Sequence, residues 1–249
     1  MVDSVRRSLE SILTQVDERF EIIVVDSCSD DGSLNILRDY QGKRIKLIVQ
    51  ACSIGLGRQI ATENSRGKYV ISHMDMDDVF QPNLNKLLQI YHTNFEGCML
   101  VVQHRPSVYS GIMIAPRKLL DAVGGYKDLN FLEDRDLFSR VAQLGYLRFL
   151  KSFPIIDRSI KKSKLHQRVI SLLAKEYFAF RESFRLGYGS RLCYYVFVRK
   201  PHFFLIRLPI MFWAFVTHWF YPQSRNRFLK TFKMNDYETR IDESVEREM

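Results

Sequence analysis

The sequence predicts a doubly wound α/β fold, in which helices cover both faces of a mostly parallel sheet. Apolar runs of strand length alternate with amphipathic helical patterns over roughly 75 residues of the 249-residue chain. The first run, FEIIVVD at residues 20–26, resembles strands that are buried on both faces. Clusters of turn-forming residues, such as SCSDDGS at residues 27–33, separate the elements.

The expected elements follow one another in a regular order up to about residue 150. Helices are expected where apolar residues recur every three or four positions, and strands where short apolar runs lie between turn signals. Pro82 marks one helix start, since proline is tolerated in the first turn. The predicted helices are residues 5–16, 33–40, 58–65, 83–92, 117–122 and 133–144. The predicted strands are residues 20–26, 44–50, 69–74, 99–103 and 110–114.

Composition excludes several classes of protein. With 46% hydrophobic and 26% charged residues, the chain is neither disordered nor of low complexity. Its four cysteines show no CxxC spacing, which argues against a zinc site or a disulfide framework and favours a reducing compartment. Residues 1–15 are amphipathic rather than continuously apolar, so a secretory signal peptide is not expected.

Charge divides the chain into two parts. The formal net charge is +9, from 37 Lys+Arg and 28 Asp+Glu. Residues 158–233 hold 16 of these basic and 2 of these acidic residues, a local net charge of +14. We therefore expect an α/β domain over residues 1–155 and a basic, helical, membrane-associating extension over residues 156–249. Such a basic segment favours an anionic partner.

The extension contains a 19-residue apolar run at residues 203–221, FFLIRLPIMFWAFVTHWFY. Its length approaches the ~20 residues of a membrane span, but Arg207, Pro209 and His218 lie inside it. Basic residues flank both ends, which favours a helix or re-entrant hairpin lying at the anionic, cytoplasmic face of a membrane. A true span and a core helix of a soluble subdomain are the alternatives. We expect no nucleic-acid partner, because so apolar a surface suits nucleic acid poorly.

Two acidic segments follow predicted strands and are expected to share one crevice. Asp26 ends the first strand, and Asp75, Asp77 and Asp78 follow the third. Ligands of doubly wound folds bind beyond the carboxyl ends of the strands, so these distant segments should converge. Clustered carboxylates favour Mg²⁺ or Mn²⁺, which often hold phosphates as well. The alternative for the second segment is an Asp-rich turn that caps the next helix.

Two further motifs contain residues suited to binding or catalysis. Residues 53–57 are expected to form a glycine-containing loop, in which Gly55 and Gly57 permit close approach of the backbone to a ligand, and Arg58 after it can clamp a phosphate. The segment lacks the G-K-[ST] of a P-loop. Gly125 belongs to a GGY turn, and the later carboxylates of Glu133 and Asp134 can supply a general base. An acidic helix N-terminus is the alternative for that pair, and it is the expected explanation for Asp136.

In this order, the motifs resemble those of family 2 glycosyltransferases of the GT-A fold. The matching stretches, within about residues 5–150, are VVDSCSDDGS, GLGRQIATENSRGKYV, MDMDD, GIMIAPRKLLDAVGGY and FLEDRDLFSRVAQLG. The resemblance implies a Rossmann-like, mostly parallel sheet flanked by helices. It also implies transfer of a sugar, with inversion, from a nucleotide-diphosphate donor to a hydroxyl acceptor such as a lipid-linked glycan or cell-surface polysaccharide.

The resemblance also implies roles for individual residues on the donor side. Asp26 matches the residue that contacts the nucleotide base, and Arg58 matches a basic residue near the donor. Asp75 and Asp77 match a D-x-D pair that binds Mg²⁺ or Mn²⁺, with Asp75 also near the ribose or donor sugar.

On the acceptor side, Asp134 matches the general base, with Glu133 and Gly125 beside it. The chain departs from the pattern in two places. Family members open with a strand of the type VSVIIPTYN, and this sequence is expected to begin after it. Ser27 stands where an acidic residue often follows the position of Asp26. A catalytically inactive, membrane-bound module is therefore the alternative function.

Overall fold

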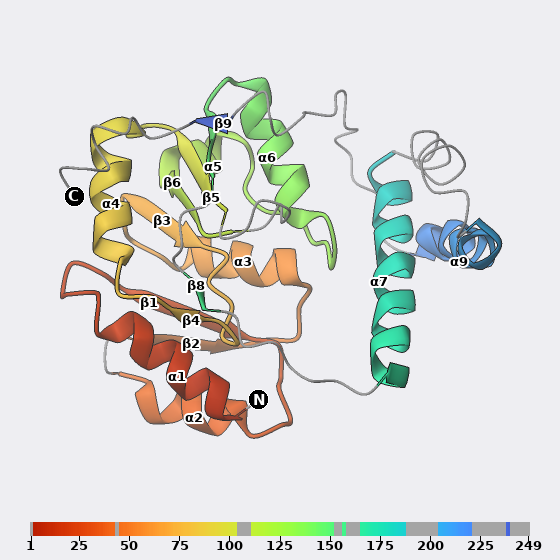
Figure 1. Cartoon of the computed structure of the whole chain (residues 1–249), viewed down its shortest axis with the longest axis horizontal. Helices are drawn as coiled ribbons and strands as arrows, with labels where there is room; N and C mark the ends of the chain where they lie inside the picture. Colours follow the sequence, from red (N-terminus) through yellow and green to blue (C-terminus); the bar gives the residue numbers. More distant parts are fainter. Residues whose placement is uncertain are drawn as a thin grey trace.

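The described strands form a smaller, two-stranded parallel sheet, a larger, five-stranded sheet and a further short strand pair, with helices packed around them (Figure 1). The computed structural model describes residues 2–42, 45–103, 111–151, 156–157, 165–187, 204–220 and 238–239. In Figure 1, helices α1 and α2 lie below the smaller sheet, and α7 and α9 lie to the right of the α/β part.

The smaller sheet consists of two parallel strands, β1 (Ile22–Asp26) and β2 (Ile45–Val49). Their register pairs Ile22 with Ile45 and Asp26 with Val49. Helices α1 (Val2–Leu13) and α2 (Ser33–Tyr40) bury their apolar faces against this sheet. The shared core consists of Val5, Leu9, Val24, Ile36, Leu37 and Ile45.

The larger sheet has five strands in the order β3-β6-β5-β7-β9. Strand β6 runs antiparallel to both neighbours, whereas β5, β7 and β9 are mutually parallel. These strands are β3 (Tyr69–Ser72), β5 (Met99–Val102), β6 (Met113–Pro116), β7 (Leu147–Leu150) and β9 (Glu238–Thr239).

Helices and a short strand pair complete the α/β part. Two apolar clusters form its core, one with α4 and one with α6. The helices are α3 (Ile54–Glu63), α4 (Leu84–Asn94), α5 (Arg117–Ala122) and α6 (Glu133–Gln143). The short antiparallel pair is β4 (Val79–Phe80) with β8 (Ile156–Asp157).

A cavity of about 1490 Å³ lies along the facing edges of β1 and β3. Every residue of both strands lines it, although consecutive strand residues point to opposite faces of a sheet. The cavity therefore follows the strand edges themselves, and among the described strands β1 pairs only with β2. Val5 and Ile12 of α1 and Thr62 of α3 also line it. This cavity contains the candidate site.

Most predicted element bounds agree with the structure to within two residues, but three do not. The helix predicted at residues 5–16 is α1, which ends at Leu13. The prediction of a loop at residues 53–57 is wrong, since α3 begins at Ile54. Ser53 caps this helix, because its Oγ accepts a hydrogen bond from the amide of Leu56 at 3.1 Å. The strand predicted at residues 110–114 lies instead at Met113–Pro116, and residues 104–110 are outside the described part.

The basic extension contains two packed helices, α7 (Leu165–Arg185) and α9 (Phe204–Thr217), and the 3₁₀ turn η3 (His218–Phe220). Phe180 and Ala214 form the centre of their contact. Strands β8 and β9 lie beyond residue 155 yet pair with strands of the α/β part, so the division at that residue stays a prediction. Within the described residues, no helix combines the length and apolar character needed to cross a membrane.

Candidate functional site

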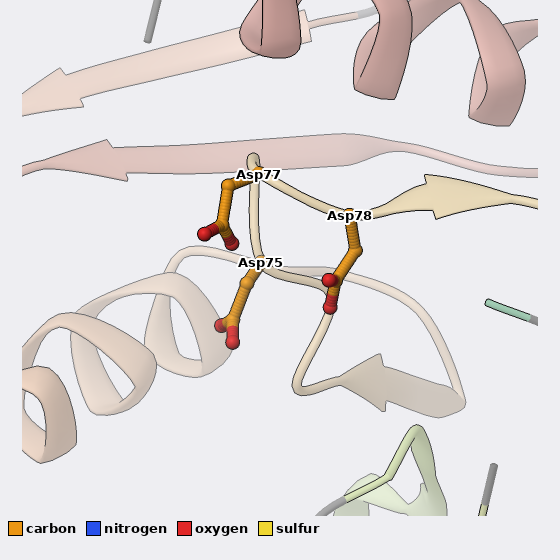
Figure 2. A group of neighbouring side chains, drawn as sticks. All are labelled: Asp75, Asp77 and Asp78. Carbon is orange, nitrogen blue, oxygen red and sulfur yellow. The ribbon is translucent and has the colours of Figure 1, made fainter. Parts of the chain in front are cut away.

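Three aspartates come together on the loop between β3 and β4. Figure 2 shows Asp75, Asp77 and Asp78, and their carboxylates offer oxygen atoms that all lie within 4.8 Å of one another. The loop is closed by a hydrogen bond from the amide of Asp78 to the carbonyl of Asp75 at 3.1 Å. Asp75 and Asp77 are exposed and Asp78 is buried. Such a set of hard oxygen donors suits Mg²⁺ or Mn²⁺.

Asp78 belongs to the acidic segment that the sequence predicted to favour Mg²⁺ or Mn²⁺, although the resemblance assigned the metal only to Asp75 and Asp77. Its position next to Asp77 was the available signal, but adjacent residues in a strand or loop often point in different directions. The turn after β3 brings its carboxylate back towards the other two (Figure 2). The predicted pair Asp75 and Asp77 is thus joined by a third oxygen donor.

Arg58 joins three of the motifs that the sequence separates. Its Nη1 lies 2.5 Å from Oε1 of Glu133, and its Nη2 lies 3.5 Å from Oδ1 of Asp75. The three side chains come from α3, from the start of α6 and from the loop after β3. The Arg58 and Glu133 side chains are largely buried. Their charges are thus paired where solvent screens poorly, which strengthens the attraction.

The expected convergence of the two acidic strand ends on one cavity is confirmed. Asp26, Arg58, Asp75 and Asp77 all line the cavity between β1 and β3. Asp26 is buried at the end of β1, where its Oδ1 accepts a hydrogen bond from the amide of Ser29 at 2.8 Å. Asp134 does not line this cavity. It is connected to the cavity through its neighbour Glu133, which Arg58 holds.

Glu133 and Asp134 open α6 after an unusual backbone conformation. Leu132 has φ 64°, a left-handed conformation that is strained for a bulky residue. Burial, then the charge of Asp134, raises the pKa of Glu133, and Arg58 opposes this shift. Burial also raises the pKa of Asp134, opposed first by the hydrogen bond from the amide of Arg135 at 2.6 Å. A carboxylate with a raised pKa is a stronger base.

Comparison with known proteins decides the family. Residues 2–148 match the family model described as glycosyl transferase family 2. The chain belongs to glycosyl transferase family 2. This result confirms the resemblance inferred from the five motifs.

A curated relative and two solved structures are similar to the family 2 chain. The putative teichuronic acid biosynthesis glycosyltransferase TuaG of Bacillus subtilis (strain 168) is 33% identical over 92 residues, 35% of this chain and 36% of TuaG. The match thus spans about a third of that relative's length. The mannosyltransferase PcManGT from Pyrobaculum calidifontis, solved with GDP-Man and Mn²⁺, gives a TM-score of 0.59 at 16% identity, covering 90% of this chain and 73% of that one. TarS of S. aureus gives 0.53 at 17% identity, covering 80% and 44%. These likenesses confirm the GT-A fold.

The inner wall of the site in this family 2 chain is built from neutral, buried groups. The hydroxyl of Tyr126 bonds with Oγ of Ser72 at 2.7 Å and lies 3.4 Å from Nε2 of His73. Burial raises the pKa of Tyr126 to about 12. Burial, and next the charge of Arg58, lowers the pKa of His73 well below its usual value. His73 is therefore neutral at physiological pH and serves as packing beside the acidic loop.

A buried ion cluster holds the start of α6 against the GGY turn. Asp136 is buried, with Nζ of Lys127 at 2.8 Å from its Oδ1 and Nη2 of Arg140 at 2.5 Å from its Oδ2. Arg140 also donates to the carbonyl of Gly125 at 2.7 Å. The acidic helix N-terminus considered for this segment therefore does not explain Asp136, which is an internal ion-pair partner.

Gly55 and Gly125, one from each of the two glycine-containing motifs, serve packing within the protein. A Cβ added at Gly55 would lie 2.1 Å from the carbonyl oxygen of Lys127, and the amide of Gly55 donates to the carbonyl of Leu129 at 2.9 Å. Gly125 has φ 61°, and a Cβ there would lie 2.1 Å from Oε1 of Gln59. The idea that Gly55 lets the backbone approach a ligand is wrong, since the close approach is to the loop before α6.

Proposed function

We propose that this protein is a metal-dependent, inverting glycosyltransferase that moves a sugar from a nucleotide-diphosphate donor to a hydroxyl acceptor. The observation that carries the proposal is the link from Arg58 to Asp75 and Glu133 beside a cavity that Asp26 and Asp77 also line. Donor-side and acceptor-side residues are thereby held at one place. Membership of family 2 supports the same reaction class.

On the donor side, the cavity offers acidic groups at two positions. Asp26 at the end of β1 would accept hydrogen bonds from the nucleoside, and both Asp26 and the adjacent Ser27 line the cavity. Asp77 and Asp75, with Asp78 close by, would hold Mg²⁺ or Mn²⁺. When bound, the cation would act as a Lewis acid that neutralises the charge of the departing diphosphate. Arg58 holds Asp75 in place for this role.

On the acceptor side, Asp134 is proposed as the general base. Its raised pKa suits removal of a proton from a hydroxyl group. The acceptor oxygen loses its proton to the carboxylate and forms the new bond to the anomeric carbon as the bond to the diphosphate breaks. One displacement from the face opposite the leaving group inverts the anomeric centre. Glu133, paired with Arg58, and Gly125 in the adjacent turn position this side of the site.

The acceptor class is proposed from chemistry and from one relative. TuaG is described as a teichuronic acid biosynthesis enzyme, which supports a lipid-linked glycan or cell-surface polysaccharide as acceptor. Such acceptors are assembled at a membrane, in agreement with the basic extension. The proposed location is therefore the cytoplasmic face of a membrane.

Calorimetry with a panel of nucleoside diphosphates, each with and without Mn²⁺ or Mg²⁺, tests this function. We expect one nucleotide to bind, and the metal to tighten its binding by about tenfold or more. Asp77→Ala should remove the metal effect, whereas Asp39→Ala, an exposed site on α2 with the same change of charge, should retain it. If no nucleotide binds the native protein, the inactive, membrane-bound module is the better explanation.

A further inference from the structure

One face of α9 and η3 consists of apolar side chains exposed to solvent. Phe212, Trp213 and Trp219 are 66%, 60% and 68% exposed, and Phe220 is 81% exposed. The spacing of residues 208, 212, 215, 216 and 219, all apolar and all exposed, places them on one side of the helix. The described residues of α9 and η3 contain no carboxylate.

The opposite face of α9 is fixed to α7, so the apolar face is held outwards. Ala214 is fully buried against Phe180, and the hydroxyls of Tyr177 and Thr217 lie 2.8 Å apart. An ion pair joins Nη2 of Arg207 to Oε1 of Glu176 at 2.6 Å. These contacts use the side of α9 turned away from the exposed face. The exposed apolar face therefore has a fixed orientation relative to α7.

The length of α9 argues against a span. A helix of 14 residues is about 21 Å long, shorter than the ~30 Å hydrocarbon core of a bilayer. Pro209 lies within it, and Arg207 is engaged on α7. A helix of this kind, with tryptophans on its apolar side, fits the boundary between lipid headgroups and acyl chains.

The charge of the surrounding sequence indicates which surface this face would meet. Between Ser183 and Asn235 the sequence contains nine Lys+Arg and no Asp or Glu. The basic residues occur on both sides of the apolar run, as in helices that lie flat on anionic lipid. A protein partner with an apolar groove would not require this excess of positive charge. The complementary partner is an anionic bilayer surface.

We propose that the exposed face of α9 and η3 docks the protein onto an anionic lipid bilayer by interfacial insertion. Docking would also position the candidate site, since Nη2 of Arg185 at the end of α7 donates to the carbonyl of Asp128 at 3.2 Å. The adjoining loop reaches the cavity, which Asn130 lines. Binding to lipid is independent of nucleotide and is measured without it, so it can succeed or fail separately from the proposed sugar transfer.

The two tryptophans of the chain make the test specific. Trp213 and Trp219 are the only tryptophans, so intrinsic tryptophan fluorescence reports on this face alone. Titration of the full chain with vesicles of phosphatidylglycerol and phosphatidylcholine should shift the emission to shorter wavelength, and the protein should sediment with the vesicles. Vesicles of phosphatidylcholine alone should bind at least about tenfold more weakly, and added salt should reduce the difference.

A matched pair of double variants distinguishes binding through this face from nonspecific binding through any exposed apolar side chain. Phe212→Ser with Phe220→Ser retains both tryptophans and should weaken vesicle binding by about tenfold or more, because two exposed aromatic anchors are lost. Leu144→Ser with Tyr146→Ser removes two exposed side chains near the end of α6, 51% and 49% exposed, and should leave binding unchanged. Circular dichroism would confirm that both variants fold.

Three results would overturn the proposal. One is the absence of vesicle binding by the native protein in both assays. Another is equal loss of binding in the two double variants. The third is a tryptophan shift that depends on protein concentration without vesicles, together with dimers in sedimentation, which would assign the face to a second copy of the chain.

Discussion

The guanidinium of Arg58 lies 2.5 Å from a carboxylate oxygen of Glu133, a residue 75 positions later in the chain. The same guanidinium reaches Asp75 on the acidic loop at 3.5 Å. Arg58 is therefore a structural link between the proposed metal-binding and acceptor sides of the site. Any loss of this link should affect stability as well as binding.

Replacing Arg58 with Gln should destabilise the protein, because it leaves Glu133 buried without its cationic partner. We expect the free energy of unfolding to fall by roughly 2–4 kcal/mol, measured by urea denaturation. Glu133→Gln together with Arg58→Gln should recover part of that loss, since no buried charge then remains. If the losses of the two single variants simply add, the side chains are not energetically coupled.

Mn²⁺ alone should stabilise the protein if the three aspartates bind it. A ligand present at about 100 times its Kd contributes about 2.7 kcal/mol to folding, which a thermal melt detects readily. Asp75→Asn with Asp77→Asn should abolish this stabilisation, and a chelator should reverse it in the native protein. Asp39→Asn serves as the control. A Tm that Mn²⁺ raises equally in both variants would place the ion elsewhere.

As the pH is lowered, activity should begin to fall at a higher pH than it would if the general base were an aspartate of ordinary pKa. The raised pKa of Asp134 means that its carboxylate takes up a proton before an exposed aspartate does, and a protonated base is inactive. A pH profile of kcat/KM should show this acid limb. Asp134→Glu should retain some activity and Asp134→Asn should lose about a hundredfold or more.

The raised pKa of Asp134 also affects folding stability, but here the protonated form is the favourable one. Because the folded-state pKa of Asp134 lies above its unfolded value, the stabilisation from the protonated form is lost as pH rises through the folded pKa. Asp134→Asn should therefore be neutral or stabilising at pH 7 while it removes activity. Marked destabilisation at that pH would mean that the carboxylate is needed for the fold.

Local signals predicted the helices and five strands up to about residue 144, but they missed the strands β4, β7, β8 and β9 and did not show how the sheets are assembled. The helices at residues 33–40 and 117–122 coincide with the prediction, because turn formers and Pro116 delimit them clearly. Strand neighbours depend on long-range pairing, so the separation of β1 and β2 from β3 was not readable from the sequence. Gly55 and Gly57 suggested a loop since glycine is a poor helix former, whereas the cap at Ser53 and packing against Leu129 favour the helix.

The candidate site was predictable to the extent that it depends on strand ends. Asp26 and Asp77 follow strands, and the fold class alone places them at one cavity. The pairing of Arg58 with Glu133 has no local signal, because it joins two helices across the fold. The left-handed conformation of Leu132 could not be foreseen either, since leucine rarely adopts it.

The buried cluster around Asp136 should contribute more to stability than to catalysis. Its carboxylate is fully buried between Lys127 and Arg140, so Asp136→Ala leaves two largely buried cations without their anionic partner. We expect a loss of about 3–5 kcal/mol in the free energy of unfolding, measured by urea denaturation. Asp121→Ala removes an exposed carboxylate 3.8 Å from Arg117 and should cost less than about 1 kcal/mol. Equal effects in the two variants would show that Asp136 does not hold α6 against the GGY turn.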